Sequence, residues 1–308
     1  MKVLVTGASG FLGRHVLRLL QAKSVSVVTL GRSPVAGVPA SSHCERDLLA
    51  GGDLASLFEE HAPTHLLHLA WVTDPAIYQQ TPLNHRWVAA TQQLVQAFCD
   101  HGGQRVVAAG SCAEYAWDQA WCDEEETPLA PATVYGAAKD AARRQLEMLC
   151  AARQVDCAWA RIFFPYGAGQ APQRLIPSLI AALQGQRPPF PVQVLQRRDF
   201  VAVADVANAL LTLLASADCG CFNVGSGQPA AVGELLHGLA RQLDADPGPL
   251  LAVADHQKRE PMQVAADIRR LRALGWDGPL SLDAGLAQML AAGTDMRPSV
   301  AQKVLHGD

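Results

Sequence analysis

The 308-residue sequence predicts an α/β fold, a doubly wound parallel sheet (Rossmann type) with a smaller discontinuous C-terminal domain. Three observations predict it. Short apolar runs alternate with amphipathic helical patterns through the first half of the chain. The first apolar run ends in a glycine-rich turn that leads directly into a helix. Beyond residue 165, glycines and prolines interrupt the pattern and the later helical segments carry more charge.

The order of the predicted elements is that of successive strand–helix–strand units. Strands of the first half are expected at 2–6, 25–30, 42–45, 65–70, 104–110 and 156–163. Helices are expected between them, at 11–22, 53–61, 82–101 and 134–153. In the second half we expect strands at 200–203 and 221–224, and helices at 174–184, 204–215, 231–243, 266–273 and 281–292.

Composition excludes several classes of partner. Apolar residues make up 49% of the chain, the net charge is −4, and no run of Lys or Arg occurs. We therefore expect no nucleic-acid partner and no membrane binding. No signal-peptide pattern precedes the first strand, and every long apolar stretch has a polar interruption, so a cytoplasmic protein is expected.

The cysteines and histidines predict no metal site. The eight cysteines are scattered without a CxxC pair, and we expect small buried thiols that stay reduced. His65 and His68 flank an apolar strand, where a structural role is expected rather than metal binding.

The segment TGASGFLG, from Thr6 to Gly13, lies between the first strand and the first helix. Gly7 allows a tight turn, Gly10 lets a pyrophosphate approach the backbone, and Gly13 lets the helix pack closely. The helix N-terminus offers free N–H groups and partial positive charge to phosphates. The predicted dinucleotide-binding residues of this loop are Gly7, Ser9, Gly10, Phe11, Leu12 and Gly13. Residues 1–170 with about 199–225 are expected to form the dinucleotide-binding domain, and about 171–198 with 226–308 the substrate-binding domain.

The end of the second strand predicts which dinucleotide binds. An acidic residue there binds the ribose 2′-hydroxyl of NAD, but this chain has Gly31 followed by Arg32 and Ser33. An arginine fork suits the 2′-phosphate of NADP, and Ser33 can donate a further hydrogen bond. We therefore favour NADP over NAD. The alternative is that Arg32 stacks on adenine and accepts either cofactor.

Tyr135 and Lys139 lie four residues apart on a predicted helix and so share one face. A phenol has a pKa of about 10, and a nearby ammonium favours its phenolate for acid–base chemistry. Ser111 ends the strand at 104–110, at the edge of the sheet where ligands bind, and its hydroxyl can hold a carbonyl oxygen. Its alternative role is to cap the turn after the strand.

With these motifs, the chain resembles the extended short-chain dehydrogenase/reductases of the NAD-dependent epimerase/dehydratase family, nearly from end to end. Asp47-Leu48 matches the pair that contacts adenine in the family, and Leu69-Ala70 matches the segment that lines the cofactor. Further matches are the segments RIFFPYGAG at 161–169, RDFV at 198–201 with Asp205, NVG at 223–225, REP at 259–261 and LGW ending at Trp276.

The resemblance implies roles for individual residues. Ser111, Tyr135 and Lys139 would form the catalytic triad, with Lys139 also holding the nicotinamide ribose and lowering the pKa of Tyr135. Arg198 and Arg259 would clamp a substrate diphosphate. The implied substrate-binding residues are Ser111, Cys112, Phe164, Arg198 and Arg259. A homodimer is also implied, formed by the helices at 82–101 and 134–153.

The sequence departs from the family at several positions. The Asp-Glu pair of the family's 4,6-dehydratases is Cys112-Ala113 here, which disfavours dehydration. Glu114 is expected to point away if the segment stays extended. Phe164 and Trp87 replace asparagines, which leaves room for a substrate without a nucleotide.

Between Ser111 and Tyr135 the chain carries three aromatic residues, Tyr115, Trp117 and Trp121, and an acidic run at 123–126. The aromatic rings either pack on a sugar or pack locally within the loop. We expect the acidic run to be a solvated face.

The function predicted first is an oxidoreductase that reduces a 4-keto group of a nucleotide-linked sugar, or epimerises C4 through a keto intermediate. The favoured NADP points toward reduction. One alternative is a carbonyl reductase for a metabolite without a nucleotide. The other is a non-catalytic NADPH-binding regulatory protein, against which the intact set of Ser111, Tyr135 and Lys139 argues.

Overall fold

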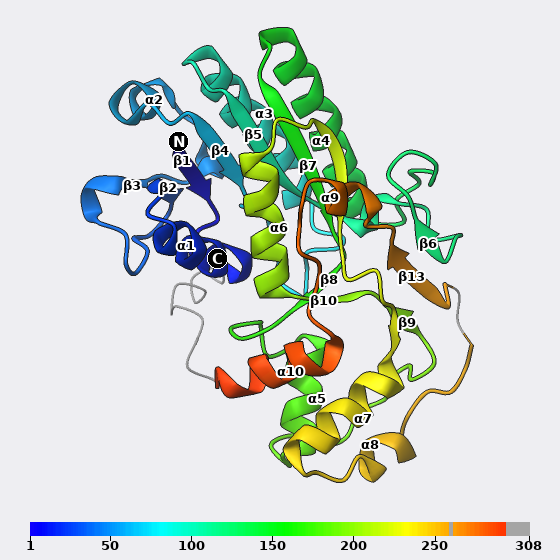
Figure 1. Cartoon of the computed structure of the whole chain (residues 1–308). Helices are drawn as coiled ribbons and strands as arrows, with labels where there is room; N and C mark the ends of the chain where they lie inside the picture. Colours follow the sequence, from blue (N-terminus) through cyan, green and yellow to red (C-terminus); the bar gives the residue numbers. More distant parts are fainter. Residues whose placement is uncertain (259–260, 294–308) are drawn as a thin grey trace.

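The computed structural model describes residues 1–258 and 261–293, and it confirms the predicted parallel sheet with a smaller C-terminal part (Figure 1). The large sheet has seven parallel strands in the order β11-β7-β5-β4-β1-β2-β3. They are β1 (Lys2–Thr6), β2 (Ser26–Gly31), β3 (His43–Glu45), β4 (His65–His68), β5 (Arg105–Ser111), β7 (Asp156–Ile162) and β11 (Gly220–Val224). The strand order turns back at β1, which creates a crevice at the carboxyl ends of β1 and β4.

Helices cover both faces of this sheet. Figure 1 shows α1 (Phe11–Ala22) and α6 (Val203–Ala215) on one face, and α3 (Leu83–Asp100) and α4 (Val134–Arg153) on the other. The short helix α2 (Ala55–His61) packs with α3. Successive strand residues point to opposite faces, so Val3 and Val5 join the core under α1 and α6, while Leu4 joins the core under α3 and α4.

The smaller part is built from segments that are far apart in the sequence. Its helices are α5 (Leu175–Leu183), α7 (Val232–Leu243), α8 (Gly248–Ala252) and α10 (Leu282–Ala291), and Figure 1 groups them below the sheet. They enclose a third core, which includes Leu179, Leu235 and Leu286. A four-stranded mixed sheet joins β12 (Ala230–Ala231), β9 (Arg197–Arg198), β13 (Gln263–Ala266) and β6 (Trp121–Cys122). A parallel pair joins β8 (Phe164–Tyr166) to β10 (Phe200–Ala202).

Short elements complete the described chain. The helix α9 (Arg269–Ala273) follows β13. Three single-turn 3₁₀ helices are η1 (Ala40–Ser42), η2 (Leu48–Ala50) and η3 (Cys112–Glu114). The turn η3 directly follows β5, and it matters for the site described below.

Most predicted elements differ from the observed ones by one or two residues at an end, and two of the differences have a structural reason. The helix expected at 266–273 begins only at Arg269, because Gln263–Ala266 pairs as a strand with β9 and β6. The strand expected at 65–70 ends at His68, since Leu69 and Ala70 turn toward the loop after β1. The domain boundaries given above stay a prediction.

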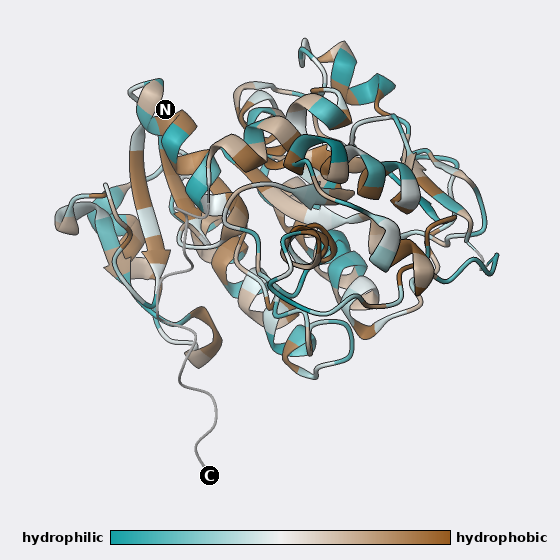
Figure 2. Cartoon of the chain, turned by 90° about the horizontal axis from the view of Figure 1, so that it is seen from below, coloured by the Kyte–Doolittle hydropathy of each residue, from teal (hydrophilic) through white to brown (hydrophobic). Residues whose placement is uncertain are grey.

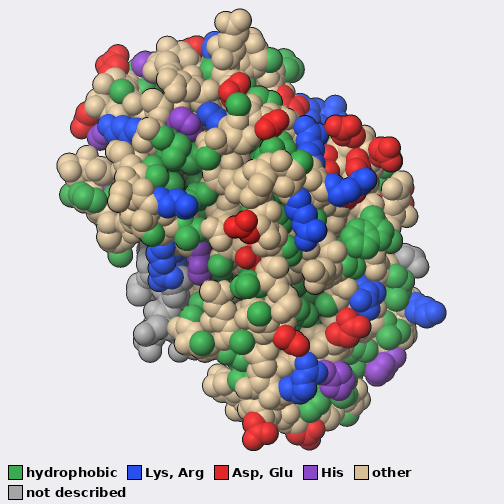
Figure 3. All heavy atoms as spheres, in the orientation of Figure 1, with side chains coloured by type: hydrophobic (Ala, Val, Ile, Leu, Met, Phe, Trp, Pro, Cys, Tyr) green, Lys and Arg blue, Asp and Glu red, His purple; other side chains and the backbone are tan. Residues whose placement is uncertain are grey.

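Hydrophobic and charged residues are distributed differently between the inside and the outside of the molecule. Figure 2 shows hydrophobic residues toward the inside of the molecule and hydrophilic residues on outer helices and loops. Figure 3 shows acidic and basic side chains interspersed on the face that it presents. Within residues 1–258 and 261–293, no helix has the length and apolar character to cross a membrane, and no cluster of His, Cys, Asp or Glu is suited to a metal ion.

Candidate active site

Ser111 lies at the last position of β5, where the chain tightens into η3. Its hydroxyl oxygen accepts a hydrogen bond from the backbone N–H of Ala113 at 3.2 Å, so Ser111 does cap this turn. The side chain of Ser111 also lies close enough to the Tyr135 phenol to lower its pKa. The structure therefore brings the serine and the tyrosine together, although 24 residues separate them in the sequence.

Gly136 explains why α4 can approach this turn. A Cβ atom at Gly136 would lie 2.1 Å from the carbonyl oxygen of Ala113 and 2.9 Å from Pro131, so only glycine allows the contact. Thr133 caps the helix, because its hydroxyl oxygen accepts from the N–H of Gly136 at 3.0 Å. Tyr135 is thereby placed in the first turn of α4, directly beside η3.

Lys139 lies one helical turn after Tyr135 and is 4% exposed. Its ammonium donates to the carbonyl oxygen of Ala109 at 2.8 Å and lies 3.8 Å from the ring centroid of Trp71. Burial lowers the pKa of Lys139 to about 7, and the charge of Glu114 opposes this shift. Near neutral pH this lysine can therefore exist in both protonation states.

The pKa of Tyr135 differs from the sequence-based expectation. Burial raises the pKa of Tyr135, and the nearby Ser111 side chain opposes the rise. The expected lowering by Lys139 is not what this structure shows, because the ammonium is directed at Ala109 and lies 5.9 Å from the Tyr135 ring centroid. The phenol is accordingly a proton donor in this state of the protein.

The glycine loop reaches these groups through the segment after β4, since Gly7 touches Ala70 and Lys139 lies over the next residue, Trp71. Gly7 has a φ of +69°, and a Cβ there would lie 2.7 Å from the backbone nitrogen of Ala70. A Cβ at Gly13 would lie 2.2 Å from the carbonyl oxygen of Gly7, so the close packing of α1 on the turn requires glycine. Gly10 begins α1 without a side-chain cap. The first N–H groups of the helix are therefore left for a ligand, which fits the pyrophosphate of a dinucleotide.

The first and fourth strands are connected by a buried histidine. His68 Nδ1 is 2.7 Å from the Thr6 hydroxyl oxygen, and its Nε2 is 2.9 Å from that of Thr91. Burial lowers the pKa of His68 to about 3, with a further contribution from Lys139. This neutral histidine holds β1, β4 and α3 together next to the loop, in agreement with the expected structural role.

The residues expected at the adenosine end are open to a ligand. Arg32 and Ser33 are exposed just after β2, and a Cβ at Gly31 would meet no atom within 4 Å. Asp47 is exposed as well, and its carboxylate caps η2 by accepting from the N–H of Leu49 at 2.9 Å. Leu48 is partly buried against the core under α3. The residues present fit an adenosine group with or without a 2′-phosphate.

Among the residues expected to bind substrate, Arg198 lies close to two aromatic rings. The guanidinium of Arg198 lies 5.8 Å from the ring centroid of Phe164 and 5.9 Å from that of Trp117. Cys112 is 5% exposed, and burial raises its pKa well above the usual value, so it is a poor proton carrier. Arg259, the second expected diphosphate ligand, lies outside the described residues.

A buried network of hydrogen-bonded side chains beneath Ser111 was not predicted from the sequence. Glu114 is fully buried and accepts from Ser111 N at 2.7 Å, Trp159 Nε1 at 2.9 Å and Arg161 Nε at 2.9 Å. Glu114 does point away from the crevice, but the reason given for it was wrong, because the segment forms η3 instead of staying extended. The capping spacing from Ser111 to Glu114 was the signal that could have revealed it.

The loop between Ser111 and Tyr135 divides into buried and exposed parts. Tyr115 is 2% exposed and donates its hydroxyl to Asn223 Oδ1 at 2.8 Å, so it packs locally instead of facing a sugar. Trp117 faces Phe164 with the ring centroids 6.1 Å apart, whereas Trp121 is exposed. In the acidic run, Glu124 accepts from the N–H of Asn223, which corrects the expectation that the whole run is solvated.

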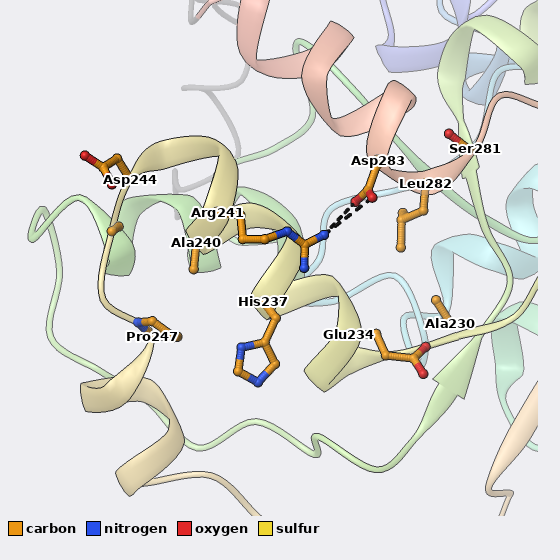
Figure 4. A pocket seen from close by; sticks show the side chains of 11 residues that line it. Ala230, Glu234, His237, Ala240, Arg241, Asp244, Pro247, Ser281, Leu282 and Asp283 are labelled. Carbon is orange, nitrogen blue, oxygen red and sulfur yellow. Dashed lines mark hydrogen bonds and ion pairs between the residues drawn. The ribbon is translucent and has the colours of Figure 1, made fainter.

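A separate hollow lies far from these groups. It has a volume of about 830 Å³ between α7 and α10, with Glu234, His237 and Arg241 along its lining (Figure 4). Arg241 and Asp283 form an exposed ion pair across it at 3.4 Å. Its side chains are mostly solvated, and none of the residues discussed above lines it.

Comparison with known proteins agrees with the geometry. Residues 3–225 match the sequence model of the NAD dependent epimerase/dehydratase family. UDP-glucose 4-epimerase of Azospirillum brasilense is 28% identical over 305 residues, which cover 89% of this chain and 86% of the relative. The dTDP-6-deoxy-L-talose 4-dehydrogenase (NAD(+)) of Aggregatibacter actinomycetemcomitans is 23% identical, over 75% of this chain and 87% of that protein.

Solved structures show the same architecture. MoeE5 in complex with UDP-glucose and NAD superposes with a TM-score of 0.80 at 28% identity, over 94% of this chain and 97% of that one. The UDP-glucose 4-epimerase of Thermotoga maritima with UDP-glucose gives a TM-score of 0.82 at 21% identity, with the same coverage. The second likeness concerns the fold alone.

Proposed function

The chain belongs to the NAD-dependent epimerase/dehydratase family, and on this premise we propose that it is an NAD(P)-dependent oxidoreductase acting at C4 of a nucleotide-linked sugar. It would reduce a 4-keto group, or epimerise C4 through a keto intermediate. The observation that carries the proposal is the meeting of Ser111, Tyr135 and Lys139 beside the glycine loop.

Each of the three side chains has a distinct role in this proposal. Ser111 holds the sugar oxygen with its hydroxyl, and Tyr135 gives its phenolic proton to a ketone oxygen or takes the proton of an alcohol. Lys139 binds the ribose hydroxyls from its position at Ala109. A bound nicotinamide would donate or accept the hydride at the sugar carbon. Because burial raises the pKa of Tyr135, proton donation to a ketone is the easier direction before the cofactor's charge is considered.

The glycine loop and the residues after β2 would hold the dinucleotide. The pyrophosphate would meet the N-terminus of α1 at Gly10, Phe11 and Leu12, with Ser9 and Gly13 shaping the turn. Leu69 and Ala70 follow β4 beside Gly7, where they would line the cofactor. We propose NADP as the favoured cofactor, supported by the exposed Arg32 and Ser33 and by the absence of an acid at Gly31. NAD is the alternative, supported by its presence in the MoeE5 complex.

Dehydration is not part of the proposal. The positions that hold acids in the dehydratases carry Cys112 and Ala113 here, and the Cys112 thiol has a strongly raised pKa. A ketoreductase or a 4-epimerase needs no additional acid at these positions. The preference for NADP favours reduction over epimerisation.

A substrate without a nucleotide is the second candidate. It is favoured by Phe164, which replaces the family's asparagine, and by Arg198, whose Nη1 already donates to the backbone oxygens of Arg197 and Pro261 at 2.8 and 3.3 Å. These bonds leave fewer donors of Arg198 for a diphosphate.

One screen separates the two candidates and tests the first. The purified protein is incubated with NADPH or NADH and either 4-keto sugars linked to UDP, dTDP, GDP or CDP or carbonyl compounds without a nucleotide, and with 4-hydroxy nucleotide sugars plus the oxidised cofactors. Absorbance of the reduced cofactor reports net oxidation or reduction, and chromatography of the sugars reports epimerisation. Turnover of at least one nucleotide sugar is expected. Turnover only of carbonyl compounds without a nucleotide would establish the second candidate. Cofactor binding without turnover of any compound would favour the remaining alternative, a non-catalytic regulatory protein.

We also propose a homodimer formed by α3 and α4. On α4, Ala138 and Ala142 are buried against the sheet, while Ala137 and Met148 are exposed on the outer face. Met148 is 72% exposed, an apolar side chain suited to burial between helices of two chains. Light scattering at micromolar concentration is expected to give twice the mass of one chain, and the mass of a single chain would contradict the dimer.

A further inference from the structure

Trp71 is the aromatic ring closest to the ammonium of Lys139. The distance from Lys139 Nζ to the Trp71 centroid is 3.8 Å, compared with 5.9 Å for Tyr135 and 6.0 Å for Trp159. Trp71 is 9% exposed and Lys139 4%, so the contact is largely shielded from water. Shielding strengthens the attraction between a cation and an aromatic face, and tryptophan provides the strongest such face.

The plane of the Trp71 ring is fixed by its surroundings. Its Nε1 donates to Asn84 Oδ1 at 2.8 Å. Asn84 is fully buried and in turn donates to the carbonyl oxygens of Tyr78 at 2.7 Å and Thr81 at 3.0 Å. Trp87 stacks on Trp71 with a centroid distance of 6.0 Å and an interplanar angle of 25°. The indole is thus a rigid surface set in place by α3 and the loop before it.

We propose that Trp71 is a positioning residue for Lys139, whose ring face holds the ammonium in its charged form at the carbonyl oxygen of Ala109. The indole and the carbonyl together leave the ammonium a narrow range of positions, from which it can meet the ribose of a bound dinucleotide. The part of this inference that concerns turnover rests on the proposed function, whereas the contact itself does not.

The other titratable groups that face Lys139 cannot replace this contact. Tyr135, on the same helix, has a raised pKa and is neutral near pH 7. His68 on β4 has a pKa of about 3 and is also neutral. Glu114 in η3 attracts the ammonium through space, but its oxygens accept from Ser111, Trp159 and Arg161. The ring of Trp71 and the carbonyl oxygen of Ala109 are therefore the two direct contacts that oppose the effect of burial on Lys139.

The protonation of Lys139 can be measured without any substrate. The chain has five lysines, Lys2, Lys23, Lys139, Lys258 and Lys303, so lysine labelled with ¹³C at the ε-carbon gives a short NMR spectrum. Lys139→Met assigns the signal, and a pH titration gives its pKa. In Trp71→Leu, which keeps an apolar side chain, the pKa is expected to fall by about one unit relative to the parent protein. Trp71→Phe restores part of the loss, because it restores an aromatic face.

Trp87→Leu is the matched control, since Trp87 is of the same size and the hydrogen bond to Asn84 still holds the Trp71 indole in this variant. It is expected to leave the pKa of Lys139 within a few tenths of the parent value. An unchanged pKa in Trp71→Leu overturns the proposal, as does an equal fall in Trp71→Leu, Trp71→Phe and Trp87→Leu, which would indicate general repacking. If the pKa shifts as expected but no substrate is turned over, the positioning role stands and the proposed function fails. In an active enzyme, the alkaline limb of the kcat profile, where Lys139 loses its proton, should move to lower pH together with the pKa of Lys139.

Discussion

Glu114 and Arg161 form an ion pair in which the two side chains are 0% and 1% exposed, with Nε and Oε2 2.9 Å apart. Arg161 also donates to the Tyr115 hydroxyl at 3.0 Å, and Trp159 donates to the same carboxylate. Burial raises the pKa of Glu114, and the charge and hydrogen bonds of Arg161 oppose the rise. The pair lies directly under the backbone N–H of Ser111, so it supports the turn that presents the serine.

Removing one member of this pair should destabilise the protein strongly. Arg161→Met leaves the Glu114 carboxylate buried without its partner, which costs about 3–5 kcal/mol. The free energy of unfolding in urea measures the loss. The control is Arg144→Met, because Arg144 is 63% exposed and its pair with Asp140 is worth about 1 kcal/mol or less. Similar decreases in the free energy of unfolding of the two variants would show that the buried pair contributes no more to stability than the exposed pair.

Tyr135→Phe should abolish turnover and leave binding of the dinucleotide intact. The variant keeps the ring but removes the hydroxyl that gives or takes the proton, a contribution of about 10²–10⁴ in rate. Steady-state rates and fluorescence titration with NADPH and NADH measure the two properties. Tyr78→Phe is the control, since its ring packs against Tyr135 at 5.0 Å between centroids and it loses only a peripheral hydroxyl. Activity that survives in Tyr135→Phe would refute the assigned role.

The double change Gly31→Asp with Arg32→Ala should raise KM for NADPH far more than KM for NADH. The new carboxylate repels a 2′-phosphate and can accept from a ribose hydroxyl, and the removed guanidinium no longer binds the phosphate. The open space around Gly31 accommodates the side chain. Initial rates with each cofactor give the comparison, with Arg241→Ala of α7 as the control. Equal changes for both cofactors would contradict the preference for NADP.

The stability of the protein should fall on acidification in part because of His68. The pKa of His68 is about 3 in the folded protein and about 6.5 in the unfolded chain. Between these values the unfolded state binds the proton and the folded state does not. The free energy of unfolding therefore decreases as the pH falls below 6.5, by at most about 1.4 kcal/mol per pH unit from this group.

Urea unfolding at pH 7.5, 6 and 5 tests this for the parent protein and for His68→Gln. The glutamine can still exchange hydrogen bonds with Thr6 and Thr91 but does not titrate, so its stability should depend less on pH over this range. The exposed His237→Gln should behave as the parent does. If His68→Gln follows the same pH dependence as the parent, the histidine is protonated in the folded state.

The elements with strong local signals were predictable from the sequence. The helix predicted at 134–153 has the same bounds in the structure, because Thr133 caps its start and the apolar period runs to its end. The turn from β1 to α1 was predictable because its glycines are required locally. Gly7 has a positive φ, and a side chain at Gly13 would overlap with the backbone of the turn. The family resemblance, carried by the same motifs, is confirmed by the match over residues 3–225.

Features that depend on contacts between distant segments were not predictable. The strand β13 needs β9 and β6 on either side, and its four residues carry no period of their own. The role of Glu114 depends on Arg161, which is 47 residues away. Trp71 reads as an ordinary apolar residue after a strand, and only the fold shows that it lies against Lys139. The raised pKa of Tyr135 likewise follows from burial, which the spacing of Tyr135 and Lys139 does not reveal.

The hydrogen bonds of Asn223 couple the unfolding of the two sheets. This fully buried residue of β11 accepts from Tyr115 and donates to the carbonyl oxygens of Cys122, on β6, and Asp267, just after β13, at 2.8 and 3.2 Å. The large sheet and the four-stranded sheet are thus joined by buried hydrogen bonds. If one sheet unfolded alone, these polar groups would lose their partners. Heat should therefore melt both parts in one cooperative transition, and a fragment that ends at residue 225 should not be a free-standing folding unit.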